Sequence, residues 1–344
     1  MRARFFIAAT ITLVWGCSPE DRPLPKSTGA QGEVLVVMEK GHWEGPPGKL
    51  VRETLGAWMP RLPQREPRFD VAQVDPAGFG DLLRTHKDLL LARIGADSSG
   101  SWSMKDRYAT DQVVVQVNDG TAAGWMERFR RMSNSICTGY EEHERARILS
   151  RERATQDATL AASIGEALGF SVVVPSGFRV IVQDRSMAWL QRDRIMSGAG
   201  LEHDVMEGLL LYQFPYTSDS TFTMEGMVQE RDKLTRMYVN GPVPGSYMVV
   251  QRAFEHLDLR PETHHLELDG EYAYRMRGLW GMEGAKMGGA FVTICRVDSA
   301  QGRVICADGF VYAPQFDKRE FVRTLEAICS SIQLVPTDPS DSIR

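Results

Sequence analysis

A helical stretch over residues 121–168 divides the chain into two halves with different patterns, and this division constrains the fold more than any other feature. Apolar residues recur at helical spacing from Trp125 through Phe129 to Ile136, which predicts a buried stripe. Between residues 140 and 156, Glu and Arg stand at i, i+4 spacings that are typical of a solvated helix. The stretch is therefore one bent helix or a pair of helices, and it serves as a connector.

Residues 33–120, before this connector, alternate short apolar runs with helical patterns. The first run is continuously apolar, as in a strand of a sheet that is covered on both faces. Four such runs stand at residues 33–38, 69–74, 88–94 and 112–117. Because the intervening segments have the length of crossover connections, we expect an α/β domain with a mostly parallel sheet.

Residues 169–335, after the connector, are rich in β-forming runs. Two helices interrupt them, one over residues 223–238 and one that begins at Asp317, where Asp317 and Glu320 match a capping box. Strands with segregated helices predict an antiparallel sheet with packed helices, an α+β domain. The fold class is therefore α+β overall, with an N-terminal α/β layer, a long helical connector and a C-terminal antiparallel sheet.

The first 17 residues have the pattern of a secretory signal. Arg2 and Arg4 precede an uncharged run at residues 5–15, and the small Gly16 stands directly before Cys17. The run is too short to span a bilayer as a mature helix. The ending is similar to a bacterial lipobox, which implies cleavage before Cys17 and attachment of palmitate and other acyl chains to it. The alternative is an ordinary signal peptide in which this Cys stands by chance.

We therefore expect a signal peptide at residues 1–16, a flexible tether at residues 17–32 and a disordered tail at residues 336–344. Ser18, where an Asp would favour the inner membrane, resembles the sorting signal of outer-membrane lipoproteins. The acidic pair at residues 20–21 resembles a signal that sends some lipoproteins to the cell surface. The expected location is the cell envelope, with the lipid in the outer membrane and the folded part on its periplasmic side or at the cell surface.

The charge of the mature chain limits its partners. Of the 40 Lys and Arg residues, two lie in residues 1–16, so 38 basic residues remain against 45 acidic ones. This mildly acidic, well-mixed composition argues against nucleic acid as a partner, because a nucleic-acid binder shows a basic stripe. No other apolar run approaches the length of a membrane span, so we expect membrane contact through the lipid on Cys17 alone.

Four further cysteines follow Cys17. Cys295 and Cys306 lie in two β-rich runs, and a hairpin register that places Val297 opposite Val304 also places the two cysteines opposite each other. They can form a cross-strand disulfide in an exported protein or remain two buried thiols, and the sequence leaves both open. The other two, Cys137 and Cys329, lie on apolar helix faces and are expected to pack in the core.

The sequence shows no recognisable catalytic, cofactor-binding or metal-binding motif. A phosphate loop, a Gly-x-Ser-x-Gly elbow, a His-Glu-x-x-His pair and a calcium-loop spacing are all missing from the sequence. Residues 141–144 are rich in potential ligands but lie in the charged middle of a helix, which predicts a solvated surface. His264 and His265 precede a strand and would point to opposite sides, which disfavours a metal site.

Two loops are candidates for a ligand surface. Trp43 and Glu44 follow the first strand, where a parallel sheet places its ligand crevice, although a core cap and a helix start suit them better. Trp280, Glu283 and Lys286 lie in a glycine-rich stretch over residues 277–290. Such a stretch forms either a binding surface or a tight excursion between two strands.

The order of these features resembles a family of uncharacterised bacterial lipoproteins, catalogued as a domain of unknown function and typical of Bacteroidetes. The residues that carry the resemblance lie at 33–38, at Trp43, at 88–91, at 174–178 and at 309–314. The family implies a lipid anchor and an envelope location and supplies no catalytic residue. Separately, residues 175–178 and the apolar ending are similar to PsbP/Mog1-like domains, which implies an α+β fold.

These observations favour a lipid-anchored envelope protein that acts as a binding or assembly module without enzymatic activity, with an envelope protein or a cell-wall component as its partner. The alternative is an envelope hydrolase with a site at the interdomain cleft. A deep cleft lined by convergent titratable groups is expected of the hydrolase. A shallow surface with an exposed apolar patch is expected of the module.

Overall fold

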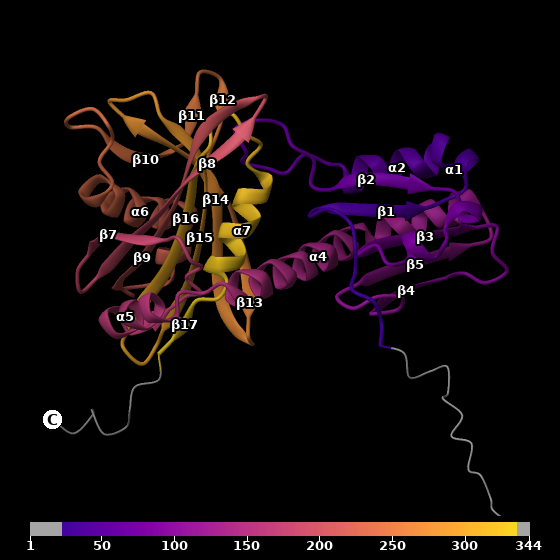
Figure 1. Ribbon diagram of the computed structural model, residues 1–344, viewed down its shortest axis with the longest axis horizontal. Coiled ribbons are helices and arrows are strands. Elements are labelled where there is room, and N and C mark those ends of the chain that lie inside the picture. Colours follow the sequence, from indigo (N-terminus) through magenta and orange to yellow (C-terminus); the bar gives the residue numbers. More distant parts are fainter. Residues whose placement is uncertain (1–22, 336–344) are drawn as a thin grey trace, which may run out of the picture.

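The long helix α4 (Ala122–Ala154) joins a five-stranded sheet to an eight-stranded sheet in the computed structural model, which describes residues 23–335 (Figure 1). Its buried side chains Trp125, Phe129, Ile136 and Tyr140 pack on the first sheet. A second helix, α5 (Ala158–Leu168), follows after a short break. The predicted helical connector is therefore a pair of helices.

The first sheet has the strand order β2-β1-β3-β5-β4. Four strands are parallel to one another, and β4 pairs with β5 in the antiparallel sense. The strands are β1 (Glu33–Val37), β2 (Asp70–Val74), β3 (Asp88–Ile94), β4 (Gly100–Lys105) and β5 (Val113–Asp119). Strand β4 was not predicted, because its Gly, Ser and Lys residues carry little β-pattern and its side chains are largely exposed.

Helical segments cover both faces of the first sheet. On one face α4 and α2 enclose an apolar core. On the other face a smaller cluster holds Phe79, Leu83 and Tyr108 against the sheet. The short elements of this domain are α1 (Lys40–Glu44), α2 (Pro46–Leu55), the 3-10 helix η2 (Pro76–Gly78) and α3 (Asp81–Arg84).

The second sheet is antiparallel, with the order β10-β14-β15-β16-β9-β8-β7, and β13 pairs with part of β14. Its strands are β7 (Arg179–Gln183), β8 (Met187–Gly198), β9 (Leu201–Pro215), β10 (Tyr247–Gln251), β13 (Glu262–Leu268), β14 (Glu271–Glu283), β15 (Gly288–Asp298) and β16 (Arg303–Tyr312).

Helices lie on both faces of the second sheet, with α7 on the face toward the first domain and α6 on the far face (Figure 1). Two short strand pairs complete the domain. The remaining elements are β6 (Phe170–Ser171), the 3-10 helix η3 (Asp219–Phe222), α6 (Met224–Tyr238), β11 (Ala253–Phe254), β12 (Leu257–Asp258), α7 (Arg319–Cys329) and β17 (Gln333–Leu334).

The predicted α+β fold class is confirmed, with a mostly parallel first sheet and an antiparallel second sheet. The flexible tether predicted at residues 17–32 ends earlier than expected. Lys26 forms a β-bridge with Thr110, and Thr28 forms one with His86. These backbone hydrogen bonds fasten the segment to the first domain.

Several predicted features lie outside the described residues. These are the signal peptide at residues 1–16, Cys17 and the tail at residues 336–344. Between residues 23 and 335, no helix has both the length and the apolar character that a membrane span requires.

Candidate functional site

The start of α7 is fastened to the first domain by Glu66. One carboxylate oxygen of Glu66 accepts a hydrogen bond from the backbone N–H of Lys318 and the other accepts one from Arg319, both at 2.7 Å. The Arg319 guanidinium in turn donates to the carbonyl of Pro67 at 2.8 Å and pairs with Asp70 at 2.5 Å. The helix therefore receives its N-terminal cap from the other domain.

This arrangement corrects the predicted capping box of Asp317 and Glu320. The helix begins at Arg319, and no side chain of its own segment caps it. Asp317 instead accepts a hydrogen bond from Gln64, and Glu320 pairs with Arg319. A sequence pattern predicts only caps from residues next to the helix. Glu66 could not be predicted in this way, because it stands more than 250 residues before the helix.

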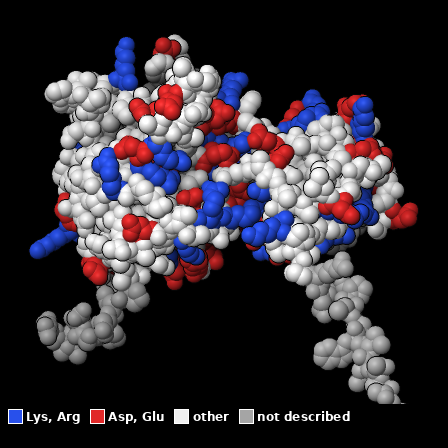
Figure 2. All heavy atoms as spheres, viewed as in Figure 1, with Lys and Arg blue, Asp and Glu red and all other residues white. Residues whose placement is uncertain are grey.

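A cavity of about 480 Å³ lies beside this junction, between α4 on one side and β13, β14 and α7 on the other. Its volume is within the range of small-molecule pockets. Figure 2 shows basic and acidic side chains gathered where the two domains meet. We call this cavity the interdomain pocket. It is lined by Arg68, Asn134, Thr138, Glu141, Glu142, Glu144, Arg145, Ile148, Glu262, His264, His265, Leu266, Glu267, Leu268, Arg275, Arg277, Arg323 and Glu326.

Two arginines of the interdomain pocket share one buried carboxylate, and the buried Arg323 and Glu144 belong to the same lining. Arg275 and Arg277 donate to different oxygens of Glu326, each with a hydrogen bond of 2.9 Å. Burial raises the pKa of Glu326, but the two guanidinium groups outweigh this effect and hold the pKa at about 2. Arg323 is 7% exposed and donates to the backbone carbonyl of Arg68. The floor formed by Arg275, Arg277 and Glu326 carries an excess of positive charge, two guanidinium groups against one carboxylate.

The walls and the rim of the interdomain pocket carry the opposite charge. Arg68 and Glu141 form an ion pair at 3.1 Å, and Glu262 lies 3.1 Å from His264. Glu142 and Glu267 are exposed at the mouth. The pocket therefore presents a cationic floor under a largely acidic rim.

The acidic segment 141–144 and the two histidines differ from their predicted roles. Glu144, expected on a solvated surface, is 3% exposed, pairs with Arg147 at 2.6 Å and accepts a hydrogen bond from the N–H of Gly32. His264 and His265 lie within β13 rather than before a strand. Among residues 23–335, no three or more His, Cys, Asp or Glu side chains are arranged to hold a metal ion.

Trp43 and Glu44 lie in α1, away from the interdomain pocket. The Trp43 ring packs under the guanidinium of Arg52, with 4.5 Å from Cζ to the ring centroid, and contacts the core of the first domain. Glu44 is exposed and lies 3.8 Å from Lys40. Trp43 therefore acts as a cap on the core, the second of the two roles that the sequence allows.

The glycine-rich stretch over residues 277–290 is a tight excursion between two strands, the second of the two predicted possibilities, and most of it lies within β14 and β15 rather than in a loop. Trp280 lies in β14, is 1% exposed and donates its indole N–H to the carbonyl of Val311 at 3.3 Å. A Cβ atom at Gly289 would stand 2.0 Å from that same carbonyl oxygen, so glycine is needed for close strand packing rather than for a flexible turn. Of the three residues predicted as ligands in this stretch, Glu283 and Lys286, beside the short turn, are exposed.

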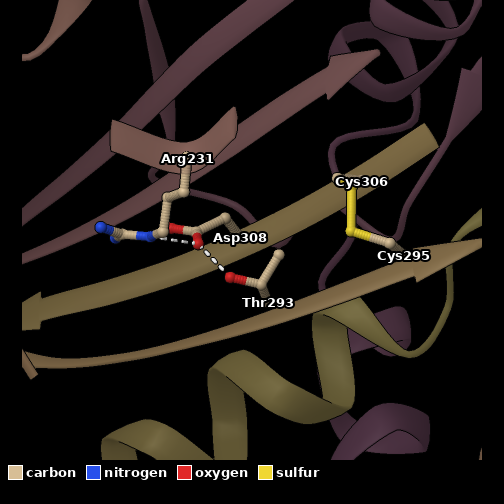
Figure 3. The surroundings of a disulfide bond; sticks show 5 residues. All are labelled: Arg231, Thr293, Cys295, Cys306 and Asp308. Atoms are coloured by element: carbon tan, nitrogen blue, oxygen red, sulfur yellow. Dashed lines mark hydrogen bonds and ion pairs between the residues drawn. A yellow bond between two sulfur atoms is a disulfide. The ribbon is translucent and has the colours of Figure 1, made fainter. Parts of the chain in front are cut away.

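The two cysteines of the β15–β16 hairpin face each other in the predicted register, with Val297 opposite Val304. Their Cα atoms are 4.2 Å apart and the sulfur atoms are bonded in a disulfide, as Figure 3 shows. Cys137 and Cys329 are buried free thiols.

Figure 3 also shows a buried ion pair beside the disulfide, which the sequence did not predict. Arg231 of α6 donates to both oxygens of Asp308 on β16, at 2.8 and 3.1 Å, and both side chains are fully buried. Thr293 donates its hydroxyl to the same carboxylate. This pair lies on the α6 face of the sheet, whereas the interdomain pocket lies on the other side, against α7.

Arg275, Arg277 and Glu326 were not predicted as site residues. Their spacing in the sequence nevertheless contains one recognisable signal. Arg275 and Arg277 are two positions apart in a β-run, which places them on one face of the strand. Glu326 lies four positions after Val322, on the inward stripe of a predicted helix. Charged residues on faces that should be buried indicate mutual ion pairs. The sequence does not show which arginine meets which carboxylate.

Comparisons with known proteins add the family. A model described as Domain of unknown function (DUF4837) matches residues 157–331, and one described as Domain of unknown function (DUF8532) matches residues 27–153. The curated proteins include no match. The expected relation to a family of unknown function is confirmed, although two family models divide the chain instead of one.

Solved structures with some likeness include Protein Mog1 in a mutant form, with 14% identity over 49% of this chain and 92% of that one, at a TM-score of 0.30. The Ran-binding protein Mog1p of Saccharomyces cerevisiae has 12% identity over 48% and 90%, at a TM-score of 0.29. A crystal structure from Bacteroides thetaiotaomicron has 9% identity over 49% and 46%, at a TM-score of 0.19. Because the first family model covers half of the chain, the protein belongs to the family described as Domain of unknown function (DUF4837).

Proposed function

We propose that the protein is a lipid-anchored binding module of the cell envelope whose ligand occupies the interdomain pocket. The observation that carries this proposal is the charge arrangement of the pocket, in which Arg275 and Arg277 share the carboxylate of Glu326 and the buried Arg323 belongs to the same lining. Arginine guanidinium groups bind carboxylates and phosphates in a fixed geometry. The ligand class that fits is a polar molecule with an anionic group toward this floor and a cationic group toward the acidic rim, such as a cell-wall peptide.

The fixed pairing of the deep charges supports binding over catalysis. A general acid or base needs a pKa close to the working pH. The pKa of Glu326, at about 2, keeps this group ionised at neutral pH, and both of its oxygens already accept hydrogen bonds from arginines. Such a group supplies a constant charge for recognition instead of moving a proton.

The hydrolase remains the second candidate, because the cleft expected of it is the one found. The interdomain pocket is lined by titratable groups, and His264 lies 3.1 Å from Glu262 at its edge, a pairing that can orient an imidazole for acid–base work. A His264→Gln variant that binds a ligand as well as the wild type but loses turnover in a hydrolase substrate screen would favour this candidate over the module.

Anchoring through Cys17 is supported by the sequence pattern of residues 1–17. Metabolic labelling with palmitate and fractionation of membranes would test it. The wild-type chain should carry label and sediment with the membranes, and Cys17→Ala should lose both properties. A Cys17→Ala product that is still acylated and membrane-bound would contradict the lipobox assignment.

Binding at the interdomain pocket can be tested by calorimetric titration of the full chain, solubilised in detergent, with a soluble digest of cell wall. Arg145 lines the pocket, is half-buried and takes part in none of the ion pairs among the described residues. Arg145→Gln should weaken binding about tenfold, the effect of one charge-assisted hydrogen bond.

Arg130→Gln is the matched control, because Arg130 is an exposed arginine on the same helix outside the pocket. This variant should bind like the wild type. Equal affinities for Arg145→Gln and the wild type, or no heat of binding in any protein, would contradict the proposed ligand class.

A further inference from the structure

The first sheet contains a topological switch point between β1 and β3. The chain leaves β1 through α1 and α2 toward β2 at one side, whereas it leaves β3 toward β4 and β5 at the other side. The loops that follow the two neighbouring strands therefore diverge at the carboxyl edge of the sheet. In open α/β sheets, ligands bind in the crevice that such divergence leaves.

A cavity of about 300 Å³ occupies this crevice. Glu39 and His42 line it from the segment after β1, Gly95 and Ala96 line it from the turn after β3, and Pro76 lines it from η2. Trp43 and Glu44, the residues expected at this edge, are not part of the lining. The cavity lies at the sheet edge where a ligand surface was predicted, but the side chains that line it are other ones.

A second cavity of about 240 Å³ adjoins the first, and the two share Pro76, Ala92 and Arg93. We call the two together the switch-point groove. The second cavity has an apolar floor that includes Val37 and Leu91. It differs in chemistry from the first, which contains Glu39 and His42.

The basic and aromatic groups of the second cavity are arranged around its apolar floor. The Arg84 guanidinium lies 6.0 Å from the ring centroid of Phe79 and 5.9 Å from that of Tyr108. Arg84 and Arg93 line this cavity, and its lining includes no carboxylate. Arg84 is 3.1 Å from Asp81, but both side chains are exposed, so this pair is weak. Arg93 is exposed and belongs to none of the ion pairs among residues 23–335.

We propose that the switch-point groove is a ligand site for a small anionic molecule with an aromatic body. The aromatic body would lie on the apolar floor beside Phe79 and Tyr108, and the anionic group would lie between Arg84 and Arg93. Guanidinium groups favour both partners, because they pair with anions and stack on aromatic rings. Glu39 and His42, in the adjoining cavity, offer an acceptor and a titratable donor to any polar substituent of the ligand.

The switch-point groove is independent of the interdomain pocket. Helix α4 begins beside the carboxyl end of β5, where Trp125 donates to the carbonyl of Val117. Its later part reaches the opposite end of the sheet, where Arg147 pairs with Asp88 at the start of β3. The interdomain pocket uses this later part, whereas the groove lies at the carboxyl edge. A lack of binding at one site therefore does not imply a lack of binding at the other.

A fluorescence titration of the full chain with 1-anilinonaphthalene-8-sulfonate tests the proposal, because this probe has an aromatic body and a sulfonate. N-phenyl-1-naphthylamine is the neutral counterpart with the same body. The sulfonate probe should bind with saturation and about tenfold more tightly than the neutral one. Arg93→Gln should remove this difference in affinity, and Phe79→Ala should weaken the binding of both probes.

Arg130→Gln is again the control and should leave both titrations unchanged. Arg93 is exposed, so Arg93→Gln should keep the circular dichroism spectrum and the unfolding midpoint of the wild type. Three results would each overturn the proposal: no saturable binding of the sulfonate probe, equal binding of the two probes to the wild type, or unchanged binding in Arg93→Gln.

Discussion

Glu66 is a single residue that connects the two domains, because its carboxylate caps a helix of the other domain. We expect Glu66→Ala to lower the free energy of unfolding by about 1–2 kcal/mol, since two N–H groups lose their acceptor. Urea denaturation followed by circular dichroism measures this change. Asp317→Ala removes the predicted capping residue and should change stability by less than about 0.5 kcal/mol. The opposite ranking of the two variants would restore the local capping box.

Glu326 makes stability depend on pH. Its pKa is about 2 in the folded protein and 4.5 as the ordinary value, so its contribution is complete above pH 4.5 and is lost as the pH falls toward 2. The lowered pKa corresponds to about 3 kcal/mol. The difference in unfolding free energy between wild type and Glu326→Gln should therefore be large at pH 7 and shrink steadily below pH 4.5. A difference that is constant from pH 7 to pH 3 would contradict the assigned ion pairs.

At the residue scale, the sequence predicts those side-chain pairings that follow from the alternation of side chains along a strand. The pairing of Cys295 with Cys306 follows from the two-residue period of the hairpin. It does not predict the partners of Glu66 or Glu326, because these contacts join segments that only the assembled fold brings together. The interdomain pocket is made of such contacts, and for this reason none of its residues was a predicted ligand.

Helix α6 is held on its sheet by a buried ion pair between Arg231 and Asp308. Asp308→Asn should cost about 3–5 kcal/mol, because it leaves the Arg231 charge buried without a counter-charge. The double variant Arg231→Met, Asp308→Leu should recover most of this loss. The unfolding free energies of the wild type, Asp308→Asn and the double variant measure this recovery.

Asp193→Asn is the matched control, since Arg179 and Asp193 form an exposed pair on the same sheet, 2.8 Å apart. Its effect should be below about 1 kcal/mol. A loss in the double variant as large as that in Asp308→Asn would contradict the assignment of the cost to an unpaired charge.

The β15–β16 hairpin is closed by the disulfide between Cys295 and Cys306. A loop of this length corresponds to about 3 kcal/mol of stabilisation in the chain-entropy model. Reductant should therefore lower the urea midpoint of the wild type toward that of the double variant Cys295→Ala, Cys306→Ala, and should leave the double variant unchanged. A wild-type midpoint that does not respond to reductant would favour two free thiols.

At the element scale, strongly periodic segments such as α4 and α6 are predictable because one buried face sets their pattern. Strands β14 and β15 illustrate where this reasoning fails. Their glycines have the composition of a loop, but at Gly289 of β15 the glycine lets the neighbouring strands approach closely. Composition cannot distinguish these two uses of glycine, so the loop that was expected around Trp280 proved to be paired strands.

The whole molecule is a pair of domains joined by α4 (Figure 1). The contact between Glu66 and α7 closes them, and the interdomain pocket lies between them. The two-domain organisation follows from the sequence because the halves differ in pattern. The pocket does not, because it depends on how α4 lies against β13 and β14. We expect a ligand in this pocket to contact both domains and thereby to stabilise their arrangement.

Hydrogen–deuterium exchange of the full chain, with and without a soluble cell-wall digest, tests the central claim most directly. The ligand should slow exchange together in three segments that are far apart in sequence: residues 134–148 of α4, strand β13 and helix α7. Exchange elsewhere in the second sheet should change little. Unchanged exchange in all three segments at a saturating concentration of digest, or protection confined to residues away from the interdomain pocket, would contradict a ligand site between the domains.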